Sequence, residues 1–182
     1  MPILGIMASA MSGNLFAPSG AYDSLSSVTL SATQSSITFS GIPATYTHLQ
    51  IRMITLVDIS TVNTHITVNS DSGSNYSWHE LYGDGATVTA GAGATQTFMK
   101  AGITQSTTTG YTGAAIVDIL DYANTNKYKT IRVLTGSDAN GSGYAILRSG
   151  NWRNTNAITS ITLTAGSNNL KQYSSFALYG IK

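Results

Sequence analysis

Few residues of this chain could take part in acid–base or metal chemistry. Its 182 residues include one glutamate, Glu80, together with seven aspartates and three histidines. His79 directly precedes Glu80, whereas His48 and His65 lie on two predicted strands and could meet if those strands were neighbours. A metal site needs three or four converging ligands, and the sequence contains no HExxH or comparable spacing. We therefore expect three isolated histidines and no metal site.

Asp118 and Asp121 are the carboxylates that come nearest to a catalytic pair. Glycoside hydrolysis needs two carboxyl groups that face one cleft, but a spacing of three on a strand places the side chains on opposite faces. Asp118 is therefore expected to form a buried hydrogen bond or an interface contact. The sequence has no GxSxG or GxxxxGK[ST] motif and no cysteine. We predict that the protein is not an enzyme and binds no cofactor.

Aromatic side chains near asparagines indicate a second kind of site. Trp78, Tyr82, Trp152 and Asn154 could contact a sugar ring by stacking and hydrogen bonding, which would make them glycan or receptor contacts. Tryptophan and tyrosine also pack against a sandwich core, with the polar end of the ring at the rim. The sequence favours the core interpretation and leaves the glycan interpretation open.

Charge is scarce along the whole chain. Charged residues make up 9%, the formal net charge is +1, and all nine Lys and Arg lie at or beyond Arg52. Lys127, Lys129 and Arg132 form a modest basic group on one predicted strand, but nucleic-acid binding is typical of a strongly basic patch. A net charge this small also gives no long-range attraction to anionic lipid. We expect no specific nucleic-acid partner and no membrane.

The elements that must position these residues are predicted to be short β-strands. Hydrophobic residues make up 42% of the chain, which is enough for the core of one domain. Tyr46–Val57 gives the clearest pattern, because Leu49, Ile51 and Met53 alternate with polar residues. Further strands are predicted at Val28–Leu30, Ile37–Phe39, His65–Val68, Tyr76–Tyr82, Thr112–Tyr122, Tyr128–Thr135, Tyr144–Arg148, Ile158–Ala165 and Ser174–Ile181.

Such strands, separated by Gly-, Asn- and Ser-rich turns, predict an all-β fold. The expected class is an antiparallel β-sandwich or jelly-roll-like single domain. Thr112–Tyr122 is almost continuously apolar, which predicts a buried strand. Ala86–Thr112 is either a mobile excursion or two edge strands around Phe98–Ile103, and a helical turn could form near Tyr122–Asn126.

The first residues form an uncharged and mostly apolar segment. A secretory signal needs a positive n-region, which is missing because no Lys or Arg precedes Arg52, and Met1–Met11 is too short to span a bilayer. We predict an extended N-terminal arm over residues 1–22 and a β-sandwich domain over residues 23–182. The alternative for Met1–Met11 is a first strand. The predicted partner-docking residues are Ile3, Leu4, Ile6, Met7, Met11, Leu15 and Phe16.

Three segments resemble a known group of proteins. The opening Met1-Pro-Ile-Leu-Gly-Ile-Met-Ala-Ser9, the block Ile37-Thr-Phe-Ser-Gly-Ile-Pro-Ala-Thr-Tyr-Thr-His-Leu-Gln-Ile-Arg52 and the ending Phe176-Ala-Leu-Tyr-Gly-Ile181 are similar to segments of tailed-bacteriophage virion structural proteins. The resemblance covers both ends and the first third of the chain. It implies a capsid-associated or tail-associated component of the phage particle and carries over no catalytic residue.

Composition and resemblance together favour a structural role. We expect a capsid cement or decoration protein that stabilises the head lattice by non-covalent contacts. It would be made in the host cytoplasm and act on the exterior of the virion, as a homotrimer bound to the major capsid protein. Other virion proteins or a host glycan are further possible partners. The alternative function is a receptor-binding, glycan-binding domain of a tail fibre or tail tip.

Overall fold

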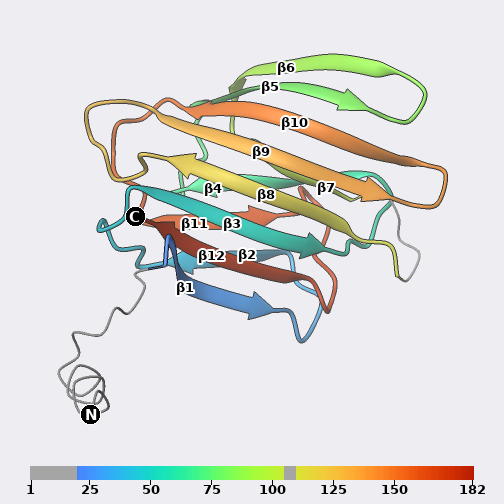
Figure 1. Ribbon diagram of the computed structural model, residues 1–182, viewed down its shortest axis with the longest axis horizontal. Coiled ribbons are helices and arrows are strands. Elements are labelled where there is room, and N and C mark those ends of the chain that lie inside the picture. Colours follow the sequence, from blue (N-terminus) through green and yellow to red (C-terminus); the bar gives the residue numbers. More distant parts are fainter. Residues whose placement is uncertain (1–19, 105–109) are drawn as a thin grey trace, which may run out of the picture.

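The computed structural model describes residues 20–104 and 110–182, which form twelve β-strands. All strand pairs are antiparallel, and the strands form two sheets packed as a sandwich, which confirms the predicted fold class (Figure 1). The strands are β1 (Tyr22–Thr29), β2 (Ser36–Ser40), β3 (His48–Thr55), β4 (Val62–Val68), β5 (Tyr76–Gly83), β6 (Val88–Gln96), β7 (Met99–Thr104), β8 (Gly113–Leu120), β9 (Lys129–Asp138), β10 (Gly143–Trp152), β11 (Ser160–Thr164) and β12 (Ser175–Ile181).

The strand order defines a jelly roll with a lateral extension. The larger sheet has the order β1-β12-β3-β8-β9-β10-β5-β6, and the smaller sheet has the order β2-β11-β4-β7. In β1-β12-β3-β8 and β2-β11-β4-β7, the first strand pairs with the last and the second with the second-to-last, as in a jelly roll. The hairpins β9–β10 and β5–β6 continue the larger sheet beyond β8 (Figure 1).

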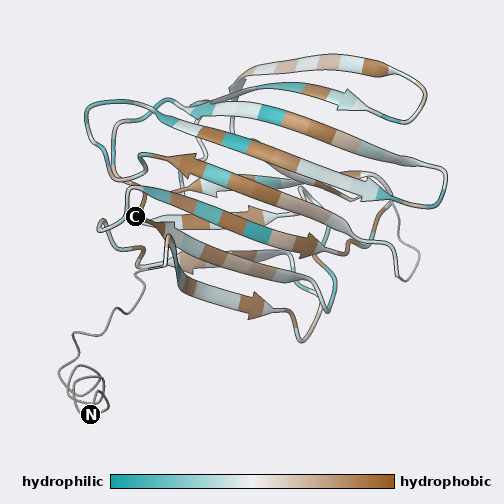
Figure 2. Ribbon diagram, viewed as in Figure 1, coloured by the Kyte–Doolittle hydropathy of each residue, from teal (hydrophilic) through white to brown (hydrophobic). Residues whose placement is uncertain are grey.

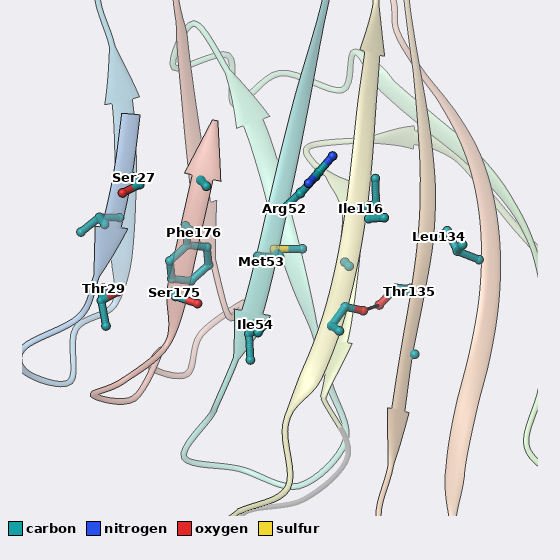
Figure 3. Close-up of a pocket in the computed structure, with 15 residues that line it drawn as sticks. Ser27, Thr29, Arg52, Met53, Ile54, Ile116, Leu134, Thr135, Ser175 and Phe176 are labelled. Atoms are coloured by element: carbon teal, nitrogen blue, oxygen red, sulfur yellow. Dashed lines mark hydrogen bonds between the residues drawn. The ribbon is translucent and has the colours of Figure 1, made fainter. Parts of the chain in front are cut away.

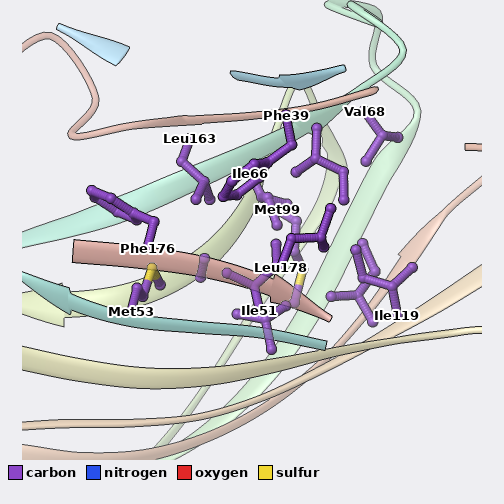
Figure 4. Packing of buried hydrophobic residues seen from close by; sticks show 14 of the residues in the cluster. Phe39, Ile51, Met53, Ile66, Val68, Met99, Ile119, Leu163, Phe176 and Leu178 are labelled. Carbon is purple, nitrogen blue, oxygen red and sulfur yellow. The ribbon is translucent and has the colours of Figure 1, made fainter. Parts of the chain in front are cut away.

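The hydrophobic core lies between the two sheets. Leu49, Ile51 and Met53 of β3 point inward as predicted, and each is at most 3% exposed. They belong to one buried cluster with Ile66 of β4 and Met99 of β7 (Figure 4). Hydropathy alternates along most strands (Figure 2), since successive residues of a strand face opposite sides of a sheet.

β8 differs from the strand that its composition predicts. The almost continuous apolar run Thr112–Tyr122 predicts a buried strand, but β8 buries only alternate residues, and Ile116 is 41% exposed. Ala115, Val117 and Ile119 face the core, so Ile116 faces the outer side of the larger sheet. The prediction was wrong on this face because the smaller sheet packs against only one side of the larger one.

The open question about Ala86–Thr112 is resolved for its described residues. β6 and β7 occupy most of this range, and each is the edge strand of its sheet, as the second of the two interpretations predicts. No helix forms near Tyr122–Asn126, where the described residues make a turn. β9 and β10 also run further than the predicted strands Tyr128–Thr135 and Tyr144–Arg148. Their hairpin loop is therefore shorter than the stretch Gly136–Gly143 that separates these predicted strands.

Two of the three phage-like segments are neighbours in the fold. The block Ile37–Arg52 ends in β3, and Phe176–Ile181 lies within β12. β3 and β12 pair directly, with Leu49 opposite Gly180 and Met53 opposite Phe176. These segments, which are far apart in sequence, therefore form one structural unit.

The arm prediction concerns residues that precede the fold. The docking residues Ile3, Leu4, Ile6, Met7, Met11, Leu15 and Phe16 lie outside the described residues. The described residues begin at Gly20. Tyr22, the last residue of the predicted arm, is the first residue of β1. Within the described ranges, no helix has the length and hydrophobicity needed to cross a membrane.

Candidate functional site

Large apolar side chains gather on the outer side of the larger sheet. We call this surface the apolar face and define it by Ile54, Leu81, Val88, Ile116, Leu134 and Leu147, which are between 41% and 77% exposed. They come from six different strands of the larger sheet, namely β3, β5, β6, β8, β9 and β10. Contiguous exposed apolar surface of this kind marks interaction sites more often than isolated exposed side chains do.

The strand register places these side chains in rows. Leu81 lies opposite Leu147, Leu147 lies opposite Leu134, and Leu134 lies opposite Ile116. Directly opposed side chains on one face of a sheet are about 5 Å apart, so this row forms a continuous apolar line across four strands. The next row contains Ile54, Ala114, Gly136, Ala145, Gly83 and Val88 in successive register.

Small residues hollow out the second row. Ala114 and Gly136 of this row have little or no side chain, as does Ala177 beside Arg52, and around them lies an open depression of about 520 Å³. Ile54, Ile116 and Leu134 stand at this depression in Figure 3. The surface therefore combines exposed apolar side chains with a recess that a side chain of a partner could fill.

A polar row borders the apolar face on one side. Gln50 donates from Nε2 to Asp118 Oδ1 at 2.8 Å, and Arg132 Nη2 lies 3.5 Å from Asp118 Oδ2. Arg52, opposite Ile116, donates from Nε to Gln50 Oε1 at 2.8 Å, and its guanidinium lies over the Tyr179 ring. Asp118 thus makes a hydrogen bond, as the sequence predicts, but its side chain is 25% exposed and not buried as expected. The side chains of this row are engaged with one another.

A buried ionic cluster lies on the inner side of the larger sheet, at β5 and β10. Arg148 donates from Nε to Glu80 Oε2 at 2.6 Å, and Lys100 Nζ lies 3.0 Å from Glu80 Oε1. The Arg148 side chain is 1% exposed and that of Glu80 is 7% exposed. Arg148 also donates to Asn63 Oδ1 and to the Ala101 carbonyl of the smaller sheet. The cluster therefore connects the two sheets across the core.

The electrostatics of this cluster favour a structural role over proton transfer. Burial opposes ionisation of Glu80, but the hydrogen bonds from Arg148 and Lys100 outweigh it, and the pKa of Glu80 is lowered. A general acid or base works best when its pKa lies near the working pH. Glu80 is instead a fixed carboxylate between two cations.

The three histidines occupy separate environments. His48 accepts a hydrogen bond at Nδ1 from the Asp121 backbone at 3.0 Å, in the larger sheet. His65 lies in the smaller sheet and stacks on Phe98 with ring centroids 3.6 Å apart, so it does not meet His48. His79 is exposed on β5. In the described part of the chain, no three His, Asp, Glu or Cys side chains come together as metal ligands would.

The four candidate glycan contacts do not form one exposed site. Trp152 is 1% exposed and donates from Nε1 to Asp71 Oδ2 at 2.7 Å. Trp78 is 9% exposed, and Lys100 Nζ lies 3.8 Å from its ring centroid. Tyr82 is half-buried, and its ring contacts Tyr144 edge-on. Asn154 is also half-buried. Both tryptophans are thus core residues in this fold, as the favoured interpretation predicts.

The modest basic group is not a basic patch. Lys127 precedes β9 instead of lying on it, and its ammonium pairs with Asp121. Lys129 is 0% exposed, and Nζ donates to the carbonyls of Asn124, Lys127 and Thr155. Burial and the nearby Lys127 charge lower the pKa of Lys129. The buried charge of Lys129 therefore holds loops together, whereas Lys127 and Arg132 are 54% and 59% exposed and each pairs with an aspartate.

The apolar face was missed from the sequence. Leu81, Ile116, Leu134 and Leu147 each look like an ordinary strand residue, and only the pairing of four strands brings them into one row. One local signal is present in the sequence: within Tyr128–Thr135, Ile131 and Val133 alternate with Arg132 and Leu134. Because Arg132 is expected to face the solvent, Leu134 on the same side of the strand is an apolar residue on the outer side of the sheet.

No family model matches this sequence, and no curated protein matches it. The resemblance to tailed-bacteriophage virion structural proteins therefore stays a prediction from the three segments. The pairing of β3 with β12 gives two of these segments a common structural setting.

Proposed function

We propose that this protein is a structural component of a bacteriophage virion, acting as a capsid cement or decoration protein. The observation that carries this proposal is the apolar face, whose six exposed apolar side chains lie in two adjacent rows on the outer side of the larger sheet. Such a surface is suited to burial against another protein surface. The three phage-like segments support the choice of a virion as the setting.

The energetics favour a contact that is repeated over many copies. Full burial of one large apolar side chain contributes roughly 1.5–3 kcal/mol, and the six residues of the apolar face are about half exposed. Their burial would contribute several kcal/mol before the cost of association, which is itself about 4–15 kcal/mol. A single contact is then modest, but many such contacts in a lattice resist internal pressure together.

The proposed partners are further copies of the chain, as a homotrimer, and the major capsid protein. The protein would be made in the host cytoplasm and would occupy the exterior of the particle. A quantitative gel of purified particles tests this proposal. We expect a copy number comparable to that of the coat protein, and particles that lack the protein should release DNA at a lower temperature. Absence from purified particles would overturn the proposal.

A tail fibre or tail-tip component that binds a host glycan is the second candidate. Its support is a second open depression of about 770 Å³ at one end of the larger sheet, with Tyr111, Tyr144, Asp84 and Asp138 in its lining. This depression shares Ala114 and Gly136 with the first one. This candidate predicts a few copies per particle instead of hundreds. It also predicts that the purified protein binds host glycans and that Tyr144→Ala weakens this binding. The buried Trp152 would not be a suitable residue for this test.

A further inference from the structure

We propose that the apolar face binds the segment of residues 1–19 of a second copy of this chain. This inference deepens the proposed function and rests on it, because it names the partner that would cover the exposed face in an assembly. The face and the segment are complementary in polarity. None of the six residues that define the face is charged, and the segment contains no Asp, Glu, Lys or Arg. Arg52 is the charged residue among those that line the depression, and its guanidinium is engaged with Gln50 and the Tyr179 ring.

The segment supplies the side chains that the face requires. Ile3, Leu4, Ile6, Met7, Met11, Leu15 and Phe16 are all large and apolar. Methionine fills irregular recesses well because it is unbranched and flexible. Such side chains fit the depression beside Ile54 and Leu134, where Ala114 and Gly136 leave space.

The length of the segment allows it to reach another copy. Nineteen residues can span at most about 60 Å when extended. The larger sheet has eight strands, which at about 4.8 Å between neighbours gives a width of roughly 34 Å. A segment that leaves one molecule at Gly20 can therefore cross to the face of an adjacent one.

The position where the segment joins the domain favours a neighbour over the same molecule. Tyr22 pairs with Ile181, and Ile181 pairs with His48, at one end of the strands. The polar row with Asp118 and Arg132 lies between this end and the apolar rows. A segment folding back over its own sheet would first cross that polar row. A neighbour's segment can approach the apolar rows directly.

Disulfide trapping tests this inference cleanly because the chain contains no cysteine. Two singly substituted proteins, Leu147→Cys and Met7→Cys, would be mixed and oxidised. We expect a disulfide-linked heterodimer, at a yield about tenfold above that of a matched mixture of Thr130→Cys with Met7→Cys. Thr130 is exposed on β9 but lies outside the apolar face. Equal yields in the two mixtures would overturn the inference.

A doubly substituted protein distinguishes the neighbour from the same molecule. In Met7→Cys/Leu147→Cys, the inference predicts linked oligomers on a non-reducing gel. A monomer with an internal disulfide as the sole product would overturn it, because the segment would then cover its own face. Circular dichroism of each reduced variant verifies that the β-sandwich is retained.

The mass in solution provides a second measurement. Leu134→Asp places a carboxylate in the middle of the apolar row and should weaken self-association about tenfold or more, as should deletion of residues 1–19. Thr130→Asp adds the same charge to the same strand and should leave association unchanged. Light scattering after gel filtration reports these masses. If Leu134→Asp and Thr130→Asp associate equally, the inference is wrong.

The outcomes separate this inference from the proposed function. Trapped heterodimers from a protein that is absent from purified particles would overturn the virion role and leave the inference standing. A protein present at coat-like copy number without any trapped heterodimer would overturn the inference and leave the virion role standing.

Discussion

The ring of Tyr46 occupies the space that a side chain at position 180 would need. A Cβ built on Gly180 would collide with three ring atoms of Tyr46. Tyr46 precedes β3, and Gly180 lies near the end of β12, opposite Leu49. The contact therefore joins the segment Ile37–Arg52 to the segment Phe176–Ile181, and it explains in physical terms why a glycine stands in this strand.

Gly180→Ala should destabilise the protein by about 1–3 kcal/mol, the usual cost of overpacking a filled site. Gly83→Ala is the matched control, because a Cβ at Gly83 would meet only the Thr87 carbonyl at 3.8 Å, an ordinary contact. Urea unfolding of both variants measures the difference. Equal stability of the two variants would show that the Tyr46 ring moves aside without cost.

Glu80 should contribute to stability mainly by neutralising Arg148. Glu80→Leu leaves a buried guanidinium without its carboxylate, and the expected cost is about 3–5 kcal/mol. The double variant Glu80→Leu/Arg148→Met removes both charges and should be more stable than Glu80→Leu alone. Denaturant unfolding of the two single variants and the double variant measures this coupling.

A surface pair provides the control for this cycle. Arg132 is 59% exposed in its pair with Asp118, so Arg132→Met should change stability by less than about 1 kcal/mol. If the single costs of Glu80→Leu and Arg148→Met simply add in the double variant, the two side chains are not coupled.

His65 should make stability depend on pH between about 4 and 6.5. Burial, followed by the nearby charges of Lys100 and Arg148, lowers the pKa of His65 to about 4. Below pH 6.5 the His65 side chain binds a proton in the unfolded chain but not in the folded protein, so stability falls as pH falls towards 4. The total effect is on the order of 3 kcal/mol.

Thermal unfolding at several pH values measures this slope. His65→Gln should flatten it across that window, whereas His79→Gln, at an exposed position on β5, should leave it unchanged. A slope that persists in His65→Gln would assign the effect to another group. Glu80, whose pKa is also lowered, changes stability in the same direction, because its stabilising effect is lost as pH falls below the usual glutamate pKa of 4.5.

Lys129 should act as a cross-link between two loops. Its ammonium donates to carbonyls at Asn124, Lys127 and Thr155, so Lys129→Met leaves these acceptors without their donor. We expect a loss of about 1–3 kcal/mol and faster hydrogen exchange in the loops before β9 and after β10. Lys127→Met, with a side chain 54% exposed, should cost less than about 1 kcal/mol. Similar costs for both variants would contradict the cross-link.

Strand positions were predictable because alternation is a local property. The inward direction of Leu49, Ile51 and Met53 follows from a period of two and needs no knowledge of neighbouring strands. The exposure of Ile116 could not be predicted in this way. Its strand reads as continuously apolar, and whether a second sheet covers its outer side is decided by residues elsewhere in the chain.

The candidate site was even harder to predict from the sequence, because it depends on the register between strands. Nothing near Leu134 in sequence indicates that Ile116 and Leu147 flank it. The burial of Arg148 and Lys129 was equally hidden, since cations are seldom fully buried and their partners lie far away in sequence. Tertiary pairing, and not local composition, determines both results.

The buried cations change the charge that another molecule meets. The nine Lys and Arg and eight Asp and Glu all lie in the described residues. Removing Arg148 and Lys129 leaves 9 − 2 = 7 cations, and removing Glu80 leaves 8 − 1 = 7 carboxylates at the exterior. With neutral histidines the whole molecule keeps a formal net charge of only +1, so copies crowded together experience little net Coulomb repulsion. Their packing density should then respond little to ionic strength, in contrast to assemblies that need counter-ions to come close.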